Sequence, residues 1–217
     1  MFMNEKRVKR DKISLVFSIA ILIGEIIGQI LAAQALGWKL FCYYTQDSNL
    51  LLLIATVIWL TCVVRRLRDG VAIPRWVRVL KYTASCTVAL TFVVVLAVLA
   101  PMQVDTLSNL LFSNSMLWCH TVCPLLAIIS TLFFDTTPDL DTADTVIALI
   151  PTVIYGLVAI LLNILKVWHG PYPFLYVYEQ PVWASALWVT LIVGGAWLLS
   201  FLLYLSNRAA TREYVYR

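Results

Sequence analysis

Charged side chains are scarce in this sequence. They make up 13% of its 217 residues, whereas hydrophobic residues make up 61%, and the mean hydropathy is +0.86. A soluble domain keeps about a quarter of its residues charged, so this composition excludes one. We expect an integral protein of the cell membrane, with no segment left over to form a soluble domain.

Histidine and cysteine are also few, which limits the chemistry that the chain can carry out. The five cysteines, at positions 42, 62, 86, 119 and 123, match no disulfide framework of secreted proteins. Cys119, His120 and Cys123 are metal-ligand types, but adjacent residues on a helix point about 100° apart, and a structural zinc site needs converging ligands. We therefore expect neither a metal nor a cofactor.

Six apolar stretches are long enough to cross a bilayer, which takes about 20 residues. They run over about Ile13–Leu36, Ser48–Val64, Val79–Ala100, Leu107–Phe134, Thr145–Leu165 and Pro181–Leu205. The pattern predicts an all-α, polytopic membrane protein: one domain over residues 1–217 with six transmembrane helices. No internal repeat is visible, so an inverted-repeat transporter has no support.

Positive charge is concentrated in three segments. Of the 16 lysines and arginines, 14 lie within residues 6–12, 65–81 and 208–217, which leaves only Lys39 and Lys166 elsewhere. The positive-inside rule therefore predicts that both termini are cytoplasmic, in agreement with an even number of spans. Because topology accounts for the net charge of +4, we expect no nucleic-acid partner.

One imidazole, His120, lies in the middle of the fourth apolar stretch. A titratable ring inside hydrocarbon costs free energy unless a polar partner or a wet cavity receives it. Candidate neighbours are Glu25, which is the only carboxylate inside a span, the segment Thr45–Asn49, and Asn163. A Glu25–His120 pair that only satisfies packing is an alternative, as is a second helix that is simply well capped by Thr45–Asn49.

The expected heights of these residues leave the arrangement open. Counted from the cytoplasmic ends at 1.5 Å per residue, Glu25 lies about 20 Å up its helix and His120 about 22 Å up its own. Thr45 lies about 30 Å up the second helix, roughly 8 Å above His120. Contact between Thr45 and His120 then requires the second helix to begin below the membrane surface, or the segment Tyr43–Asn49 to dip inward.

Two further features concern helix contact and the outer surface. Gly24, Gly28, Ala32 and Ala35 form a stripe of small residues that favours close packing of the first helix. The last outer loop, Trp168–Trp183, is rich in proline and aromatic residues and is typical of a rigid lid at headgroup level. Its predicted lid residues are Tyr172, Pro173, Phe174 and Glu179.

Three motifs carry a resemblance: FCYYTQDSNLLL, CHTVCPLL and GPYPFL, in this order on six spans. The chain resembles the androgen-induced-gene family of multi-pass membrane proteins, which includes the androgen-dependent regulator of tissue-factor-pathway inhibitor. The resemblance implies hydrolysis of fatty-acid esters of hydroxy fatty acids, with Thr45 as nucleophile and His120 as its base. Asp47, Ser48, Asn49, Asn163 and Glu25 would line a polar pocket or support the oxyanion, together with backbone amides at the start of the second helix.

Other functions fit the same residues. A non-catalytic membrane protein could use the pocket to bind a lipid or small molecule, a proton-coupled carrier could use a Glu25–His120 pair, and an acyltransferase could share the scaffold. The expected partners are a lipid or fatty-acyl ester substrate and membrane lipids. A homo-oligomer is left open.

Overall fold

The computed structural model describes residues 5–102, 104–135 and 138–215, with side chains as far as residue 210. Arg217 of the basic tail lies outside this range, as does the side chain of Arg212. The described residues are all-helical, with 83% in helices and no strand. Six helices in the described part of the chain are long and apolar enough to cross a membrane, which makes this a multi-pass membrane protein by fold.

The helices follow one another with short connections. They are α1 (Glu5–Leu36), the 3₁₀ helix η1 (Gly37–Cys42), α2 (Tyr44–Asp69), α3 (Arg75–Val94), the π-helical turn η2 (Val95–Leu99), α4 (Leu107–Phe112), α5 (Asn114–Met116), the π-helical turn η3 (Leu117–Val122), α6 (Cys123–Phe133), α7 (Thr142–Ile147), α8 (Ile150–Ile164), the 3₁₀ helix η4 (Pro173–Leu175) and α9 (Val182–Val215).

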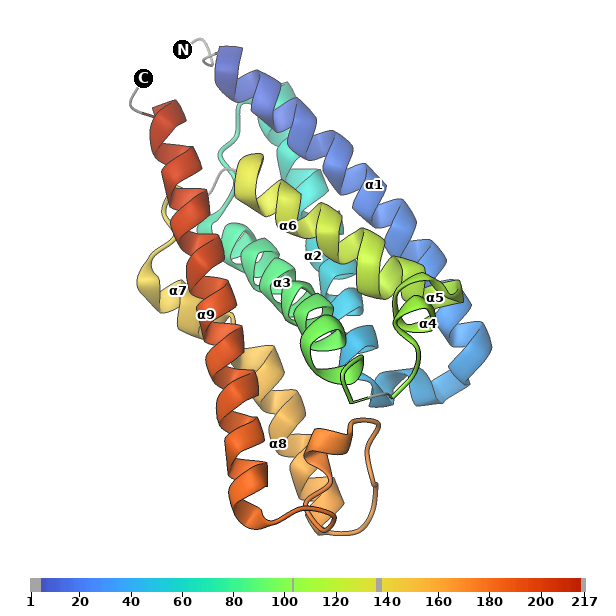
Figure 1. Ribbon diagram of the computed structural model, residues 1–217. Helices are drawn as coiled ribbons and strands as arrows, with labels where there is room; N and C mark the ends of the chain where they lie inside the picture. Colours follow the sequence, from blue (N-terminus) through green and yellow to red (C-terminus); the bar gives the residue numbers. More distant parts are fainter. Residues whose placement is uncertain (1–4, 103, 136–137, 216–217) are drawn as a thin grey trace.

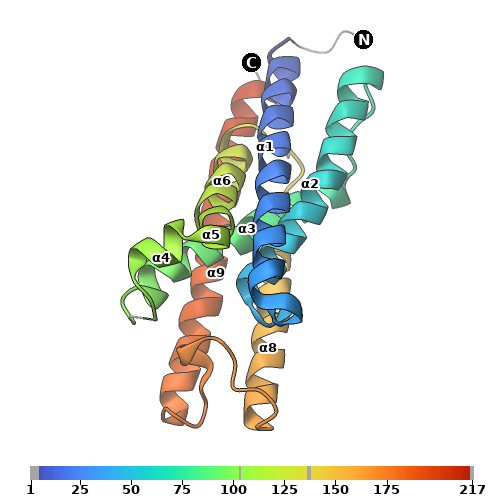
Figure 2. The same cartoon turned by 90° about the vertical axis from the view of Figure 1, so that its right-hand side faces the viewer.

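The helices α1, α2, α3 and α6 pack together as the main bundle, and α9 crosses its side against α3 and α6. The bundle core includes Ile21, Leu52, Val88 and Cys123, all fully buried. The helix α8 and the first half of α9 extend beyond the other helices, at the end opposite to the chain termini (Figures 1 and 2). The loop between α8 and α9 lies at the far end of these two helices.

The predicted span Leu107–Phe134 is not one continuous helix. The chain is extended at Ser113 and has a positive φ of 40° at Asn114, so α4 is separated from the following helix. Ser and Asn favour turns because their side chains bond to nearby backbone groups. The membrane-length helix is Asn114–Phe133, and α4 lies as a separate short helix beside η3.

The small-residue stripe on α1 makes the close contact that its spacing predicts. A Cβ atom on Gly24 would lie 2.8 Å from Sγ of Cys123, and one on Gly28 would lie 3.0 Å from Sγ of Cys119. Ala32 is also buried, whereas Ala35 is exposed, so the stripe ends before the helix does. This contact brings η3 and the start of α6 directly against α1.

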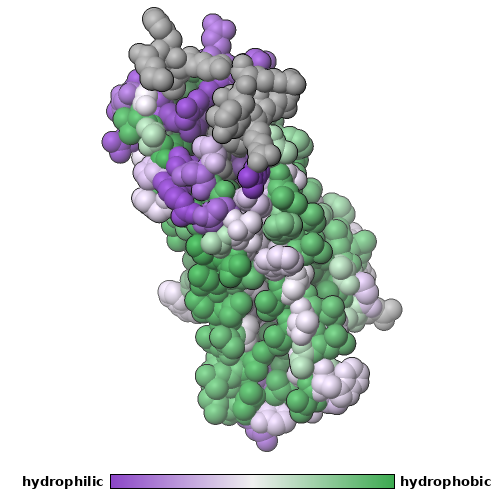
Figure 3. All heavy atoms as spheres, turned by 90° about the vertical axis from the view of Figure 1, so that its left-hand side faces the viewer, coloured by the Kyte–Doolittle hydropathy of each residue, from purple (hydrophilic) through white to green (hydrophobic). Residues whose placement is uncertain are grey.

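Polar residues gather at the end of the molecule that holds both termini (Figure 3). There the acidic connection after α6 pairs with the basic start of α3: Arg75 bonds Asp144 at 2.9 Å, and Arg78 pairs with Asp139. Asp11 and Arg66 form a further ion pair that is almost completely buried. Apolar side chains cover the surface over most of the remaining length in this view, as a bilayer requires.

Candidate active site

Thr45 and His120 are in direct contact. Oγ1 of Thr45 lies 3.1 Å from Nε2 of His120, and both residues are buried. Thr45 is the second residue of α2, and His120 belongs to the π-helical turn η3. The contact therefore joins the start of one helix to an irregular turn in another, in the half of the bundle away from the termini.

A backbone carbonyl fixes the orientation of the His120 ring. Nδ1 of His120 lies 2.6 Å from the carbonyl oxygen of Leu110, which can only accept a hydrogen bond. Nδ1 must therefore carry the proton, and Nε2 presents its lone pair to the Thr45 hydroxyl. The hydroxyl of Thr121 donates to the next carbonyl, that of Leu111, at 2.8 Å, and so holds α4 in the position from which it orients the ring.

The irregular turn η3 is a consequence of the local sequence. Pro124 lies at the start of α6 and has no amide hydrogen to donate to the preceding turn. The preceding residues, Leu117–Val122, form π-helical hydrogen bonds. A π-helical turn widens the helix and commonly occurs at functional sites, and here it turns His120 toward α2.

Two polar side chains hold the start of α2 against its neighbours, Asn49 against η3 and Ser48 against α3. Nδ2 of Asn49 donates to the carbonyl of Thr45 at 2.7 Å and to that of Cys119 at 3.0 Å. The hydroxyl of Ser48 donates to the Thr45 carbonyl at 2.9 Å, and it also lies 3.1 Å from the hydroxyl of Thr91 on α3. Asn49 thus links the residue that carries the hydroxyl to the residue that precedes the imidazole.

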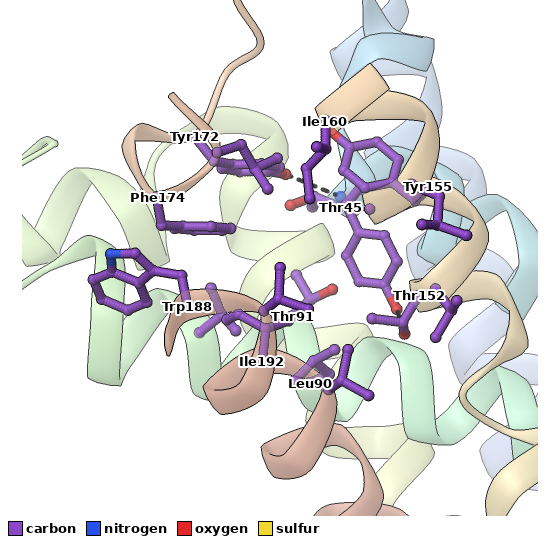
Figure 4. Close-up of a pocket in the computed structure, with 18 of the residues that line it drawn as sticks. Thr45, Leu90, Thr91, Thr152, Tyr155, Ile160, Tyr172, Phe174, Trp188 and Ile192 are labelled. Carbon is purple, nitrogen blue, oxygen red and sulfur yellow. Dashed lines mark hydrogen bonds between the residues drawn. The ribbon is translucent and has the colours of Figure 1, made fainter. Parts of the chain in front are cut away.

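A cavity of about 130 Å³ opens beside Thr45, between α3, α8, α9 and the loop Leu165–Pro181 (Figure 4). Nearly all of its lining is apolar, and its larger side chains include Leu90, Ile160, Trp188 and Ile192. The hydroxyl of Thr45 is among the few polar groups at its wall. The cavity has the character of a site for a hydrocarbon chain that ends at Thr45.

Tyr172 reaches from the loop to the same point. Its phenol oxygen accepts a hydrogen bond from the backbone amide of Thr45 at 3.4 Å (Figure 4). Its ring stacks on that of Phe174, with centroids 5.3 Å apart and planes 4° from parallel. Burial raises the pKa of the Tyr172 phenol to about 12, although polar contacts with Thr45 lower it. The phenol is therefore neutral at physiological pH.

Glu25 does not pair with His120. Both ring nitrogens of His120 are engaged, by Thr45 and by the Leu110 carbonyl. Glu25 is completely buried, but its polar neighbours are Gln29 and Cys123. The alternative of a Glu25–His120 pair therefore finds no hydrogen bond among the described residues, because the widened turn η3 directs the imidazole to α2 rather than to α1.

Asn163 and Glu179 form their hydrogen bonds with the loop between α8 and α9 rather than with Thr45 or His120. The side-chain amide of Asn163 donates to the carbonyl of His169 at 2.8 Å and accepts from the amide of Val177 at 3.2 Å. Glu179 is exposed and pairs with His169 at 2.7 Å. Both ends of the Asn163 amide are bonded to the loop, which does not support its predicted role at an oxyanion.

Asp47 and the predicted lid residues line two different hollows. Asp47 is half-buried and lines a groove of about 610 Å³ between α2 and α8, not the cavity beside Thr45. Of the predicted lid, Tyr172 and Phe174 line that cavity, and Pro173 begins η4 between them. Two of the four predicted lid residues therefore line the cavity. Asp47 lines the separate groove, and Tyr44 and Tyr155 lie between the groove and the cavity.

The sequence does not identify two groups that contact Thr45 or His120: the carbonyl of Leu110 and the hydroxyl of Tyr172. The carbonyl of Leu110 is a backbone group, and no pattern of side chains could identify it as the partner of an imidazole ten residues later. The sequence predicts Tyr172 only as a lid residue. The Tyr-Pro-Phe sequence also fits a short, stiff turn, which can hold the Tyr172 side chain in place.

Cys119 and Cys123 lie against α1, on another side of η3 from the Thr45–His120 contact. No group of three side chains that could hold a metal ion occurs among the described residues. No protein-family model matches the chain, and neither a curated protein nor a solved structure is significantly similar to it.

Proposed function

We propose that the protein is an intramembrane hydrolase of lipid esters, with Thr45 as nucleophile and His120 as general base. The observation that carries the proposal is the 3.1 Å contact between Oγ1 of Thr45 and Nε2 of His120 at the wall of an apolar cavity. A hydroxyl nucleophile needs a base within hydrogen-bond reach, and the base needs a group that orients it. The Leu110 carbonyl supplies that orientation.

In the first half of the reaction, Nε2 of His120 takes the hydroxyl proton of Thr45 while Oγ1 attacks the carbonyl carbon of the ester. The tetrahedral intermediate collapses and breaks the bond to the alcohol oxygen. His120 gives its proton to that oxygen, so the alcohol leaves neutral and the acyl group stays on Thr45.

In the second half, water attacks the acyl-threonine ester. Nε2 of His120 takes a proton from the water, and the new intermediate releases Oγ1 of Thr45, which takes the proton back. The products are a fatty acid and the original enzyme. The Leu110 carbonyl stabilises the imidazolium in both halves, because it accepts a hydrogen bond from Nδ1 throughout.

The cavity favours a fatty-acyl ester as substrate. It is lined almost entirely by apolar side chains, with Thr45 at its wall and Tyr172 and Phe174 at its outer end. A hydrocarbon chain that fills it would place its carboxyl carbon at Oγ1. The resemblance to the androgen-induced-gene family points to the same class, in which the substrates are fatty-acid esters of hydroxy fatty acids.

The distribution of charge favours cytoplasmic termini. The termini, the basic start of α3 and the acidic connection that pairs with it lie at one end of the bundle. Under the positive-inside rule this end faces the cytoplasm, and the Thr45–His120 contact then lies in the outer half of the membrane. Ester substrates would reach it from the outer leaflet.

The test is ester hydrolysis by the purified protein in detergent or lipid nanodiscs. Wild-type protein should hydrolyse a long-chain fatty-acyl ester, and T45A and H120A should each lose about 10³-fold or more in kcat while keeping the same melting temperature. T45S keeps a hydroxyl at the same position and should retain part of the activity. Wild-type turnover in T45A would exclude Thr45 as the nucleophile and with it the Thr45–His120 dyad.

Measurement of the released fatty acid also distinguishes the hydrolase from the alternative functions. A non-catalytic binding protein would bind the ester and release no acid. An acyltransferase would form a new ester with an added acyl acceptor such as a lysolipid, and would release little free acid. A proton-coupled carrier would show pH-driven flux in liposomes; no hydrogen bond between Glu25 and His120 supports it among the described residues.

A further inference from the structure

Any ester hydrolysis at Thr45 must stabilise a negatively charged oxygen on the attacked carbon. Hydrogen-bond donors about 2.7–3.1 Å from that oxygen typically contribute a factor of 10²–10³ in kcat. The expected donors were Asn49, Asn163 and the backbone amides at the start of α2. Their hydrogen-bond partners show which of them can take this role.

Most of the expected donors are already engaged in holding the site together. The amides of Gln46 and Asp47 donate to the carbonyl of Tyr43 at 2.9 and 3.2 Å. Nδ2 of Asn49 donates to two carbonyls, and the amide of Asn163 holds the outer loop. None of these groups can turn toward a substrate without breaking a bond that fixes the backbone.

Tyr172 differs from them because its hydroxyl accepts a hydrogen bond from the Thr45 amide, while no backbone carbonyl of the described residues binds its proton. The phenol oxygen lies 3.4 Å from the backbone nitrogen of Thr45. Two donors at that separation can both reach one oxygen placed about 2.9 Å from each. An ester carbonyl oxygen in this position would accept from the Tyr172 hydroxyl and from the Thr45 amide. The amide would exchange its long bond to the phenol oxygen for a shorter one to the ester, and no bond that fixes the backbone would break.

We propose that the hydroxyl of Tyr172 is a catalytic hydrogen-bond donor that, with the Thr45 amide, stabilises the oxyanion formed on the ester carbonyl. The inference rests on the proposed hydrolase function and adds a third catalytic side chain to it. The phenol remains protonated at neutral pH, as its burial requires, so it can donate. The reaction leaves its proton in place, because the hydrogen bond strengthens in the intermediate without transfer.

The loop holds Tyr172 firmly enough for this role. Its ring stacks on Phe174 and meets Tyr155 edge-on, with centroids 6.2 Å apart. The loop itself is fixed to α8 by both ends of the Asn163 amide. A donor that is held in place before the substrate arrives costs no reorganisation during the reaction.

The test compares Y172F, T45A and a matched control in the full-length protein, with a p-nitrophenyl ester of a fatty acid as substrate. Y172F keeps the stacked ring and removes only the hydroxyl, so kcat should fall about 10²–10³-fold with KM little changed. The control is Y178F, because Tyr178 is exposed in the same loop and donates to the carbonyl of Ile164, away from the cavity. Y178F should hydrolyse the ester at the wild-type rate.

The outcomes distinguish this inference from the function on which it rests. Loss of activity in T45A with wild-type kcat in Y172F would overturn the role of Tyr172 and leave the Thr45–His120 pair intact. Wild-type activity in T45A would overturn both. A raised KM with unchanged kcat in Y172F would assign the hydroxyl to substrate binding and would also overturn the oxyanion role.

A second variant keeps the test decisive if Y172F is less stable than the wild type. Fluorinated tyrosine at position 172 keeps the ring and the hydroxyl but lowers the pKa of the phenol. The donor is lost as pH rises through that pKa, so the high-pH decline of kcat should move to lower pH. A high-pH limb that does not move would overturn the proposal.

Discussion

Nε2 of His120 accepts the hydroxyl hydrogen of Thr45 across 3.1 Å, while Nδ1 of the same ring donates to the Leu110 carbonyl across 2.6 Å. The two bonds on opposite sides of the ring assign one tautomer. They also place the only imidazole within the spans where it can act as a base toward a single hydroxyl.

This tautomer is open to direct measurement. In protein labelled with ¹⁵N-histidine, His120 should show a protonated Nδ1 and an unprotonated Nε2. T45V should shift the Nε2 resonance, because it removes the hydroxyl that donates to it, whereas T45S should shift it much less. The chain has only two histidines, so H169Q completes the assignment. Protonation of Nε2 in the neutral ring would contradict the general-base geometry.

The contact between α1 and η3 predicts that the site depends on Gly24. A Cβ atom there would lie 2.8 Å from Sγ of Cys123, so G24A must push η3 and the start of α6 away from α1. Such overpacking costs about 1–3 kcal/mol of stability. A displacement of His120 by about 1 Å is expected to lower kcat/KM by up to about 10²-fold.

A double-mutant cycle checks this explanation. C123A removes the sulfur that the new methyl group would meet, so G24A/C123A should recover part of the melting temperature and of the activity that G24A loses. G195A is the matched control, because a Cβ atom on Gly195 meets no atom within 4 Å. If G24A behaves like G195A, the contact is too loose to position His120.

The sequence predicted the six spans and the residues of the site better than it predicted their heights. Hydropathy identifies every helix that can cross a membrane, because each must bury its backbone polar groups within itself. The height of a residue depends on where the count along its helix begins. The count for the second helix began at Val64, the end of its predicted span, and that residue is not level with the ends of the other predicted spans. The indole nitrogen of Trp59 donates to the hydroxyl of Ser14 at 3.0 Å, so the start of the predicted first span, Ile13–Leu36, lies level with Trp59.

Counting the second helix from Trp59 instead of Val64 removes the gap expected between Thr45 and His120. Trp59 precedes Val64 by five residues, or about 7.5 Å of helix, which nearly equals the gap of roughly 8 Å expected between Thr45 and His120. Ser14 also donates to Oδ1 of Asp135 at 2.7 Å, which puts the end of α6 at the same level. Both α2 and α1 continue beyond this level, to Asp69 and to Glu5, and no hydropathy pattern marks the level in either helix.

The break in the fourth span was harder to predict than the spans themselves. Ser113 and Asn114 are compatible with a turn, but polar residues of this size also occur inside transmembrane helices. Only the packing of α4 on η3, with its carbonyls bonded to Thr121 and His120, explains why the helix is interrupted there. That interruption is tertiary in origin, and it creates the group that orients the base.

The cavity predicts how acyl-chain length can be changed. Gly156 on α8 lines the cavity, and a Cβ atom there meets no atom within 4 Å, so G156L should fold and fill part of the space. Its four side-chain carbons displace about four methylenes, or about 3 kcal/mol of apolar burial. The kcat/KM for long-chain esters should therefore fall about 100-fold or more relative to short-chain esters.

The matched control is G194L, because a Cβ atom on Gly194 also meets no atom within 4 Å and Gly194 does not line the cavity. Hydrolysis of a series of p-nitrophenyl esters from short to long chains measures the preference of both variants. An identical chain-length profile in G156L and G194L would mean that the acyl chain binds elsewhere.

A buried ion pair predicts a stability effect that is separate from the site. Nζ of Lys81 on α3 lies 3.6 Å from Oδ2 of Asp135, and both side chains are 1–2% exposed. Asp135 also accepts from the hydroxyls of Ser14 and Ser130, so it ties α1 and α6 to α3. Removal of one partner leaves the other charge buried without compensation, which costs about 3–5 kcal/mol.

K81M should therefore lower the melting temperature strongly, because it leaves the carboxylate of Asp135 facing a methyl group. K81M/D135N removes both charges and should be less destabilised than the sum of K81M and D135N, by an amount that thermal unfolding in detergent measures. K39M is the control, because Lys39 is exposed on η1 and has no such pair in the described structure. Strict additivity in the cycle would mean that the two charges do not stabilise each other, and that the hydroxyls of Ser14 and Ser130 alone hold Asp135 in place.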